Sequence, residues 1–133
     1  MAAFNRPICC VRFLDSSNLY ARVAAAGGDS IAIHDGIVTI NSKQCDTAYI
    51  RSAIIEGHAA REYSEALPNG HRHRIFVMNA PPEYVKRSVE GLRVPRDCYY
   101  LLGDNRDDAQ DSRWRGSIPI SHIKGQVLYA YWG

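Results

Sequence analysis

The sequence has no long apolar run. No stretch approaches the roughly 18 apolar residues that a membrane-spanning helix needs. Residues 1–7, Met-Ala-Ala-Phe-Asn-Arg-Pro, lack the charged region and apolar core of a secretory signal. We therefore expect the 133-residue chain by itself to be soluble. If its parent protein sits at a membrane, we expect the anchor to lie outside these residues.

The net charge and the cysteine spacing argue against nucleic-acid binding, zinc binding and thiol redox chemistry. The net charge is only +2 and the arginines are spread along the chain, so no nucleic-acid partner is predicted. Cys9, Cys10, Cys45 and Cys98 include no C-x-x-C pair, which argues against zinc binding and thioredoxin-like chemistry. We expect buried thiols, and the disulfide state of Cys45 and Cys98 stays open.

Short β signals dominate what is present. Ile31–Ile33 and Ile37–Ile40 flank His34-Asp35-Gly36, and Asp-Gly supplies the positive φ angles of a tight hairpin turn. Further strands are predicted over residues 7–14, 19–26, 74–78, 98–102 and 126–132. The pattern predicts a single all-β domain over residues 1–133, either a coiled antiparallel sheet or a barrel-like fold.

The middle of the chain, Cys45 to Arg96, is predicted to be a less regular insertion. Residues 48–67 are compatible with helix or loop, because Ala, Glu and Arg are common there and the apolar spacing is irregular. Pro81-Pro82 followed by residues 83–90 permits one short helix, since proline is tolerated in a first turn.

One segment carries a family resemblance. Residues 103–119 read Gly-Asp-Asn-Arg-Asp-Asp-Ala-Gln-Asp-Ser-Arg-Trp-Arg-Gly-Ser-Ile-Pro. This run resembles the Gly-Asp-Asn-Arg-Asp…Asp-Ser-Arg…Gly…Pro signature of type I signal peptidases, the S26 serine peptidases. Residues 21–29, the hairpin 31–41 and the Glu-Ala-Leu-Pro-Asn-Gly run at 65–70 are similar to family blocks in the same order.

The resemblance spans about Arg6 to Trp132 and implies the signal peptidase fold. It implies a parent protein that removes signal peptides from exported proteins at the outer, periplasmic or extracytoplasmic face of the cytoplasmic membrane. The expected partner is an extended signal peptide or preprotein, with membrane attachment through an anchor outside this chain. No cofactor is implied.

The family's chemistry needs a serine nucleophile and a lysine general base. The position that matches the lysine holds Ala21. Arginine is no substitute, because its guanidinium stays protonated. Lys43, Lys86 and Lys124 are the lysines of the chain and lie in polar stretches, so we expect each to be solvated.

The other catalytic parts are also unmatched. The family's Ser-Met-x-Pro block is not found in this sequence, and Ser16 and Ser17 lie in a predicted turn. The family usually has a small hydroxyl residue that orients the lysine, and Ala109 stands there. We therefore predict that the chain is catalytically inactive.

Charged residues of the motifs remain as a structural frame: Arg22, Asp29, Asp104, Arg106, Asp111 and Arg113. We expect those of the acidic loop to pair with one another, and Arg22 to reach Asp104. Such pairs can position an active site or simply hold a loop and two strands together. Without a lysine at position 21, we favour the architectural interpretation.

Three alternative interpretations are open. The histidines of His71-Arg72-His73, with His34 or His58, could bind a metal, but no His-Glu-x-x-His pattern occurs and none is predicted. A natural paralogue could bind extended peptides without cutting them. Finally, the chain could be a trimmed or mutated, inactive form of a genuine Ser/Lys signal peptidase.

Overall fold

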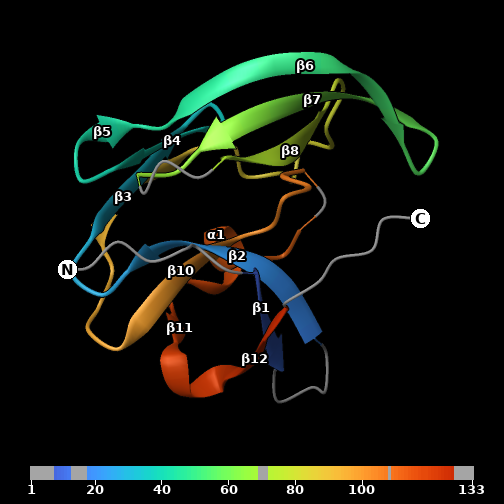
Figure 1. Cartoon of the computed structure of the whole chain (residues 1–133). Helices are drawn as coiled ribbons and strands as arrows, with labels where there is room; N and C mark the ends of the chain where they lie inside the picture. Colours follow the sequence, from blue (N-terminus) through green and yellow to red (C-terminus); the bar gives the residue numbers. More distant parts are fainter. Residues whose placement is uncertain (1–7, 13–17, 69–71, 108, 128–133) are drawn as a thin grey trace.

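A computed structural model of the chain describes residues 8–12, 18–68, 72–107 and 109–127, and it describes side chains for residues 20–68, 72–107 and 109–125. In this part of the chain the strands form three antiparallel sheets, and none closes into a barrel (Figure 1). The predicted all-β, antiparallel fold is confirmed.

Sheet A has the strand order β11-β10-β2-β1-β12. Its strands are β1 (Ile8–Arg12), β2 (Asn18–Ala26), β10 (Cys98–Leu102), β11 (Ile118–Pro119) and β12 (Ile123–Val127). The predicted strands at both ends of the chain are confirmed where they are described. A turn is predicted over residues 15–18; its first three residues lie outside the described residues, and Asn18 begins β2. Residues 128–132 of the last predicted strand also lie outside the described residues.

Sheet B has the order β5-β4-β3-β9 and contains the predicted hairpin. Its strands are β3 (Ser30–His34), β4 (Ile37–Ile40), β5 (Lys43–Gln44) and β9 (Val89–Arg93). Asp35 and Gly36 have φ angles of 49° and 85°, as a two-residue turn with two positive φ angles requires. The turn chemistry predicted from Asp-Gly is thus confirmed.

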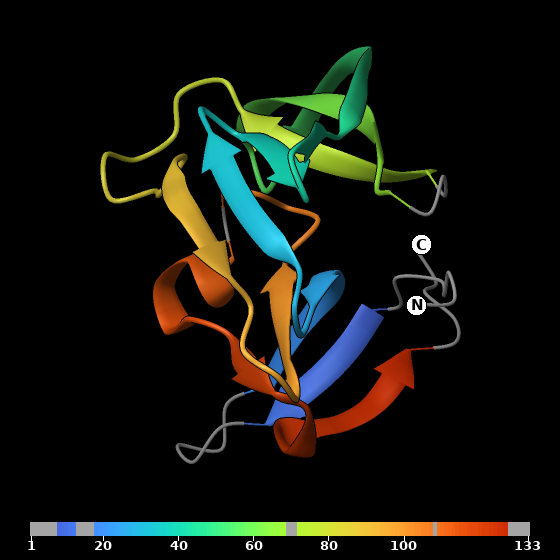
Figure 2. The same cartoon turned by 90° about the vertical axis from the view of Figure 1, so that its left-hand side faces the viewer.

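Sheet C is a long arch of three strands in the order β6-β7-β8. They are β6 (Asp46–Ile55), β7 (His58–Ala66) and β8 (Arg72–Met78). Both views place sheet C at one end of the molecule and sheet A at the other (Figure 1, Figure 2). The helix-or-loop expectation for residues 48–67 is therefore wrong, because these residues form the β6–β7 hairpin.

The physical reason for that error is the exposure of β6. All ten of its side chains are exposed or half-buried. β6 therefore has no row of core-facing apolar residues, and its sequence does not alternate between apolar and polar residues. The usable signal was Glu56-Gly57, whose φ angles are 50° and 82° at the hairpin tip.

The short helix permitted over residues 83–90 is also absent. Residues 83–84 form a turn, residues 85–88 have no regular structure, and Val89 begins β9, which pairs with β3. Pairing with the edge of sheet B takes the place of helical hydrogen bonds here. The described helical segments are α1 (Ser112–Arg115) and the 3-10 turn η1 (Ile120–His122). No helix of the described residues has the length and apolarity needed to cross a membrane.

The core lies on the two faces of sheet A. One cluster joins sheets A and B and includes Ile31, Val38 and Tyr100. A smaller cluster contains Ala21, Val23, Leu101 and Ile118, with Tyr99 and Ile123 packed against it. Successive strand residues point to opposite faces, so neighbouring Tyr100 and Leu101 belong to different clusters.

Candidate functional site

The signature loop, residues 103–111, runs from β10 to α1 and is closed by Asp111. The Asp111 side chain accepts hydrogen bonds from the Gly103 N–H at 2.9 Å and the Arg113 N–H at 3.1 Å. A Cβ atom on Gly103 would lie 2.5 Å from the Cβ of Ala109, far inside contact distance. The loop therefore requires glycine at position 103 for as long as position 109 carries a side chain.

Asp111 and Arg113 form a buried bidentate ion pair. Arg113 Nε and Nη2 each donate to an Asp111 carboxylate oxygen at 2.9 Å, and the side chains are 3% and 0% exposed. Arg113 also donates to the carbonyl of Arg106, which fastens the middle of the loop to its end. Burial, with the charge of Asp111 adding to it, raises the pKa of Tyr100 to about 12.

Arg106 pairs across to sheet C. Its Nη1 and Nη2 donate to the two Glu65 carboxylate oxygens at 2.9 and 2.6 Å, and its Nε donates to the Gly103 carbonyl at 2.9 Å. His73 Nε2 lies 2.8 Å from Glu65 Oε1. Burial by itself would raise the pKa of Glu65, but Arg106 and the His73 contact outweigh it and lower that pKa to about 2.

The loop also lies along the edge of β8. The Phe76 N–H donates to the Asp104 carbonyl at 2.9 Å, and the Arg106 N–H donates to the Phe76 carbonyl at 3.0 Å. On the other side, Arg22 of β2 donates to both oxygens of Asp104 at 3.0 and 2.8 Å. Sheet A and sheet C thus hold the same loop from two directions.

The predicted frame residues are only partly brought together. Arg22 reaches Asp104, and Asp111 pairs with Arg113, whereas Arg106 pairs outside the motif. Asp29 lies away from the loop, where it accepts from the Ala26 N–H and from Asn41 Nδ2 at the turn after β2.

Sequence reasoning missed two acidic residues. Glu65, the partner of Arg106, lies in the Glu-Ala-Leu-Pro-Asn-Gly run that already resembled the family, and that match was the available signal. Asp107 accepts from the Met78 N–H at 2.7 Å and from Arg87 Nη2 at 2.9 Å. It lies within the signature, but nothing local indicated that its partners are more than ten residues away.

Ala21 lies in the middle of β2 with its methyl group buried. It is 2% exposed and belongs to the smaller apolar cluster, while the next residue, Arg22, faces Asp104. Lys43, Lys86 and Lys124 are all exposed. Each lysine of the sequence is therefore described and lies in contact with solvent.

The serines and histidines considered from the sequence form no metal site or nucleophile among the described residues. Ser16, Ser17 and His71 lie outside the described residues. His34 and His58 are exposed, and His73 contacts Glu65. Within the described ranges, no group of three His, Cys, Asp or Glu side chains is arranged to hold a metal ion.

Comparison with known proteins identifies the family. Residues 4–132 match the family "Signal peptidase, peptidase S26". Signal peptidase I of Bacillus caldolyticus is 33% identical over 112 residues, covering 84% of this chain and 52% of that protein. Signal peptidase I of Rickettsia canadensis is 30% identical over 118 residues, covering 83% of this chain and 44% of that protein. The chain thus spans about half the length of these curated relatives.

The fold agrees with a solved relative. A crystal structure of a signal peptidase I from Enterococcus faecalis superimposes with a TM-score of 0.54 at 15% sequence identity, covering 96% of this chain and 98% of that one. At that identity the likeness concerns the fold alone. The family match over nearly the whole chain shows that this protein belongs to the signal peptidase family, peptidase S26.

Proposed function

We propose that this chain is a signal peptidase domain that does not cleave peptides with the residues it carries. The observation that carries the proposal is Ala21. The family resemblance assigns this position to the general base, and here it holds a buried methyl group within an apolar cluster. A methyl group can neither accept nor donate a proton.

No neighbouring cation of the described chain supplies the base instead. A lysine amine must lose water to become neutral near pH 7, because its ordinary pKa is about 10.4. Lys43, Lys86 and Lys124 are exposed, so they keep their hydration. Arg22 is ion-paired with Asp104, and a guanidinium does not deprotonate in proteins.

Two further parts of the family's catalytic machinery have no counterpart in this sequence: the hydroxyl residue that orients the lysine, and the serine block. Ala109 stands where the family resemblance places a hydroxyl residue, and its Cβ lies 2.5 Å from the point that a Cβ atom on Gly103 would occupy. The family's Ser-Met-x-Pro block does not occur in this sequence. We propose that the ion pairs of the signature loop now serve architecture, since their charged groups are satisfied by one another.

The family suggests the substrate class and location. Its curated relatives carry the name signal peptidase I, so we propose that the parent protein meets extended signal peptides at the outer face of the cytoplasmic membrane.

The test is direct peptide cleavage. The purified chain is incubated with a fluorogenic signal peptide that carries an Ala-x-Ala site, and the Bacillus caldolyticus signal peptidase I serves as the positive control. We expect no turnover above buffer. Ala21→Lys alone should also give none, because a base without its nucleophile has nothing to deprotonate. Turnover that copurifies with the chain and disappears in Ser16→Ala or Ser17→Ala would overturn the proposal.

A second candidate function is peptide binding without cleavage. β6 is an edge strand of ten residues, and among the described strands its backbone pairs only with β7, which suits addition of an extended peptide on its other side. Fluorescence anisotropy with the labelled signal peptide measures this binding. Saturable binding without turnover supports a binding paralogue, whereas no binding favours an inactive form of a genuine peptidase. A lysine codon at position 21 of the natural gene would also favour the inactive form.

A further inference from the structure

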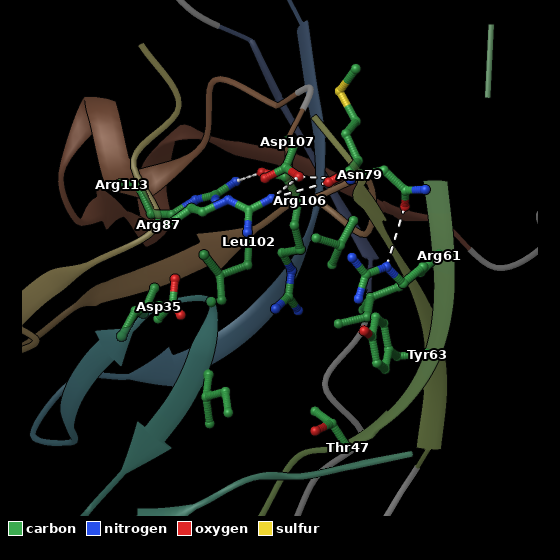
Figure 3. Close-up of a pocket in the computed structure, with 16 residues that line it drawn as sticks. Asp35, Thr47, Arg61, Tyr63, Asn79, Arg87, Leu102, Arg106, Asp107 and Arg113 are labelled. Carbon is green, nitrogen blue, oxygen red and sulfur yellow. Dashed lines mark hydrogen bonds and ion pairs between the residues drawn. The ribbon is translucent and has the colours of Figure 1, made fainter. Parts of the chain in front are cut away.

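The chain between β8 and β9 forms a loop that projects from the body of the molecule, drawn in yellow in Figure 2. At its start, the Asn79 N–H donates to the carbonyl of Ala59 at 3.0 Å. At its end, Arg87 Nη2 donates to Asp107 at 2.9 Å (Figure 3). We call residues 80–86 the β8–β9 loop. Fixed ends limit the conformations of the residues between them, which lowers the entropy lost when those residues are bound.

The β8–β9 loop contains a proline pair followed by a tyrosine, since residues 81–84 read Pro-Pro-Glu-Tyr. A proline ring fixes its own φ near −65°, and a proline that follows directs the preceding residue to an extended backbone. Pro81 meets both conditions, which specify the polyproline II conformation. Both proline rings are half-buried, so each keeps part of its surface in contact with solvent. Protein modules that bind polyproline II use this conformation because little order has to be imposed on it.

A turn directly after the proline pair presents the tyrosine. The Val85 N–H donates to the Pro82 carbonyl at 3.1 Å, which places Glu83 and Tyr84 at the centre of the turn. Val85 is half-buried, whereas Tyr84 is 75% exposed and is the most exposed tyrosine of the described residues. Tyrosine offers a large contact area at a low entropy cost and is enriched at protein interfaces. The loop therefore displays the two prolines and the tyrosine in one preformed arrangement.

The spacing of these side chains sets the kind of partner. Proline rings in the polyproline II conformation bind in grooves lined by aromatic side chains, such as those of SH3 and WW domains. SH3 grooves read two prolines that are three positions apart, and residues 84 and 85, three positions after the two prolines, are tyrosine and valine. Two adjacent prolines with a tyrosine two positions later suit a WW groove that has a second pocket for the tyrosine ring.

We propose that the β8–β9 loop is a docking site for a protein module of the WW type. The aromatic groove of the module takes Pro81 and Pro82, and its neighbouring pocket takes the Tyr84 ring. The loop contributes no residue to the apolar cluster around Ala21, so a partner bound here leaves the position of the family's general base untouched. The proposal does not depend on whether the chain cleaves peptides.

Isothermal titration calorimetry tests the docking site with the whole chain and a purified WW domain that binds Pro-Pro-x-Tyr peptides. We expect saturable binding with one WW domain per chain. The linear peptide acetyl-Ala-Pro-Pro-Glu-Tyr-Val-amide, which copies residues 80–85, should compete with the chain but bind several-fold more weakly, because it is ordered only on binding. If the whole chain does not bind, the proposal is overturned, even where the free peptide binds.

Variants of the chain locate the contact. Tyr84→Ala and Pro82→Ala should each weaken binding tenfold or more, whereas Tyr84→Phe should retain most of the affinity. Tyr49→Ala is the matched control, since Tyr49 is 56% exposed but lies on β6, outside the loop, and its variant should bind like the wild type. Circular dichroism verifies that each variant is folded. Unchanged affinity in folded Tyr84→Ala overturns the proposal, as does an equal loss in Tyr49→Ala.

Discussion

The Glu65–Arg106 pair yields a quantitative prediction about acid stability. The two side chains are 0% and 7% exposed, and the pKa of Glu65 is lowered from 4.5 to about 2. A group whose pKa is depressed by folding stabilises the protein above its unfolded pKa and loses that contribution as the pH falls. A difference of about 2.5 pKa units corresponds to about 3 kcal/mol. This is a large part of the 5–15 kcal/mol by which a domain is typically stable.

The perturbation is Glu65→Gln, and the assay is urea unfolding at pH values from 7 down to 2. At pH 7 the variant should be less stable by about 3 kcal/mol, because Arg106 keeps a buried charge without its counterion. The difference between wild type and variant should shrink progressively between about pH 5 and pH 2, as the wild-type carboxyl takes up its proton.

The exposed Glu83 provides the control, since Glu83→Gln should follow the wild-type curve at every pH. Other carboxylates titrate in wild type and variant alike, so they cancel in the difference. If the wild-type and Glu65→Gln curves run parallel down to pH 2, then Glu65 does not titrate as the structure indicates and the reasoning is refuted.

Three further predictions concern the signature loop and its surroundings. Gly103→Ala should lower the free energy of unfolding in urea by roughly 1–3 kcal/mol, because its Cβ would lie 2.5 Å from that of Ala109. Adding Ala109→Gly should recover much of this loss. If the effects of the two substitutions are simply additive, the clash is refuted. In absorbance at 295 nm, Tyr100→Phe should remove a titration step near pH 12, and loss of a step near pH 10 would contradict the raised pKa. Asp111→Asn breaks a buried ion pair and should lower the free energy of unfolding in urea by roughly 3–5 kcal/mol. Asp104→Asn breaks a partly solvated pair and should lower it by about 1 kcal/mol or less. Equal losses in the two variants would contradict burial as the cause of the difference.

Local chemistry made some of this structure predictable from sequence. Asp35-Gly36 specifies a tight turn through its own backbone preferences, and the apolar residues on either side of it alternate into the core. The solvated state of Lys43 and Lys86 followed in the same way from their polar surroundings.

The ion pairs of the signature loop and the strands of the middle segment depend on partners far away in sequence, so local patterns did not predict them. Arg106 and Glu65 are 41 positions apart, and neither residue type specifies its partner. β6 is exposed along most of its length, so the hydrophobic alternation that reveals a half-buried strand is missing. The prolines before residues 83–90 were compatible with a helix, but pairing of Val89 with Ile33 on the edge of sheet B directs the chain into a strand.

The attachment of the signature loop to β8 has a consequence for how the chain tolerates changes in length. The hairpin tip at Glu56-Gly57 is remote in sequence from Phe76, whose backbone hydrogen bonds join β8 to the signature loop. Insertions or deletions at the tip should therefore leave those hydrogen bonds intact. Trimming the arch as far as Glu65 would instead strip Arg106 of its counterion. Changes in length are therefore expected to be tolerated at the outer end of the arch, whereas its root is fixed by hydrogen bonds and an ion pair to the signature loop.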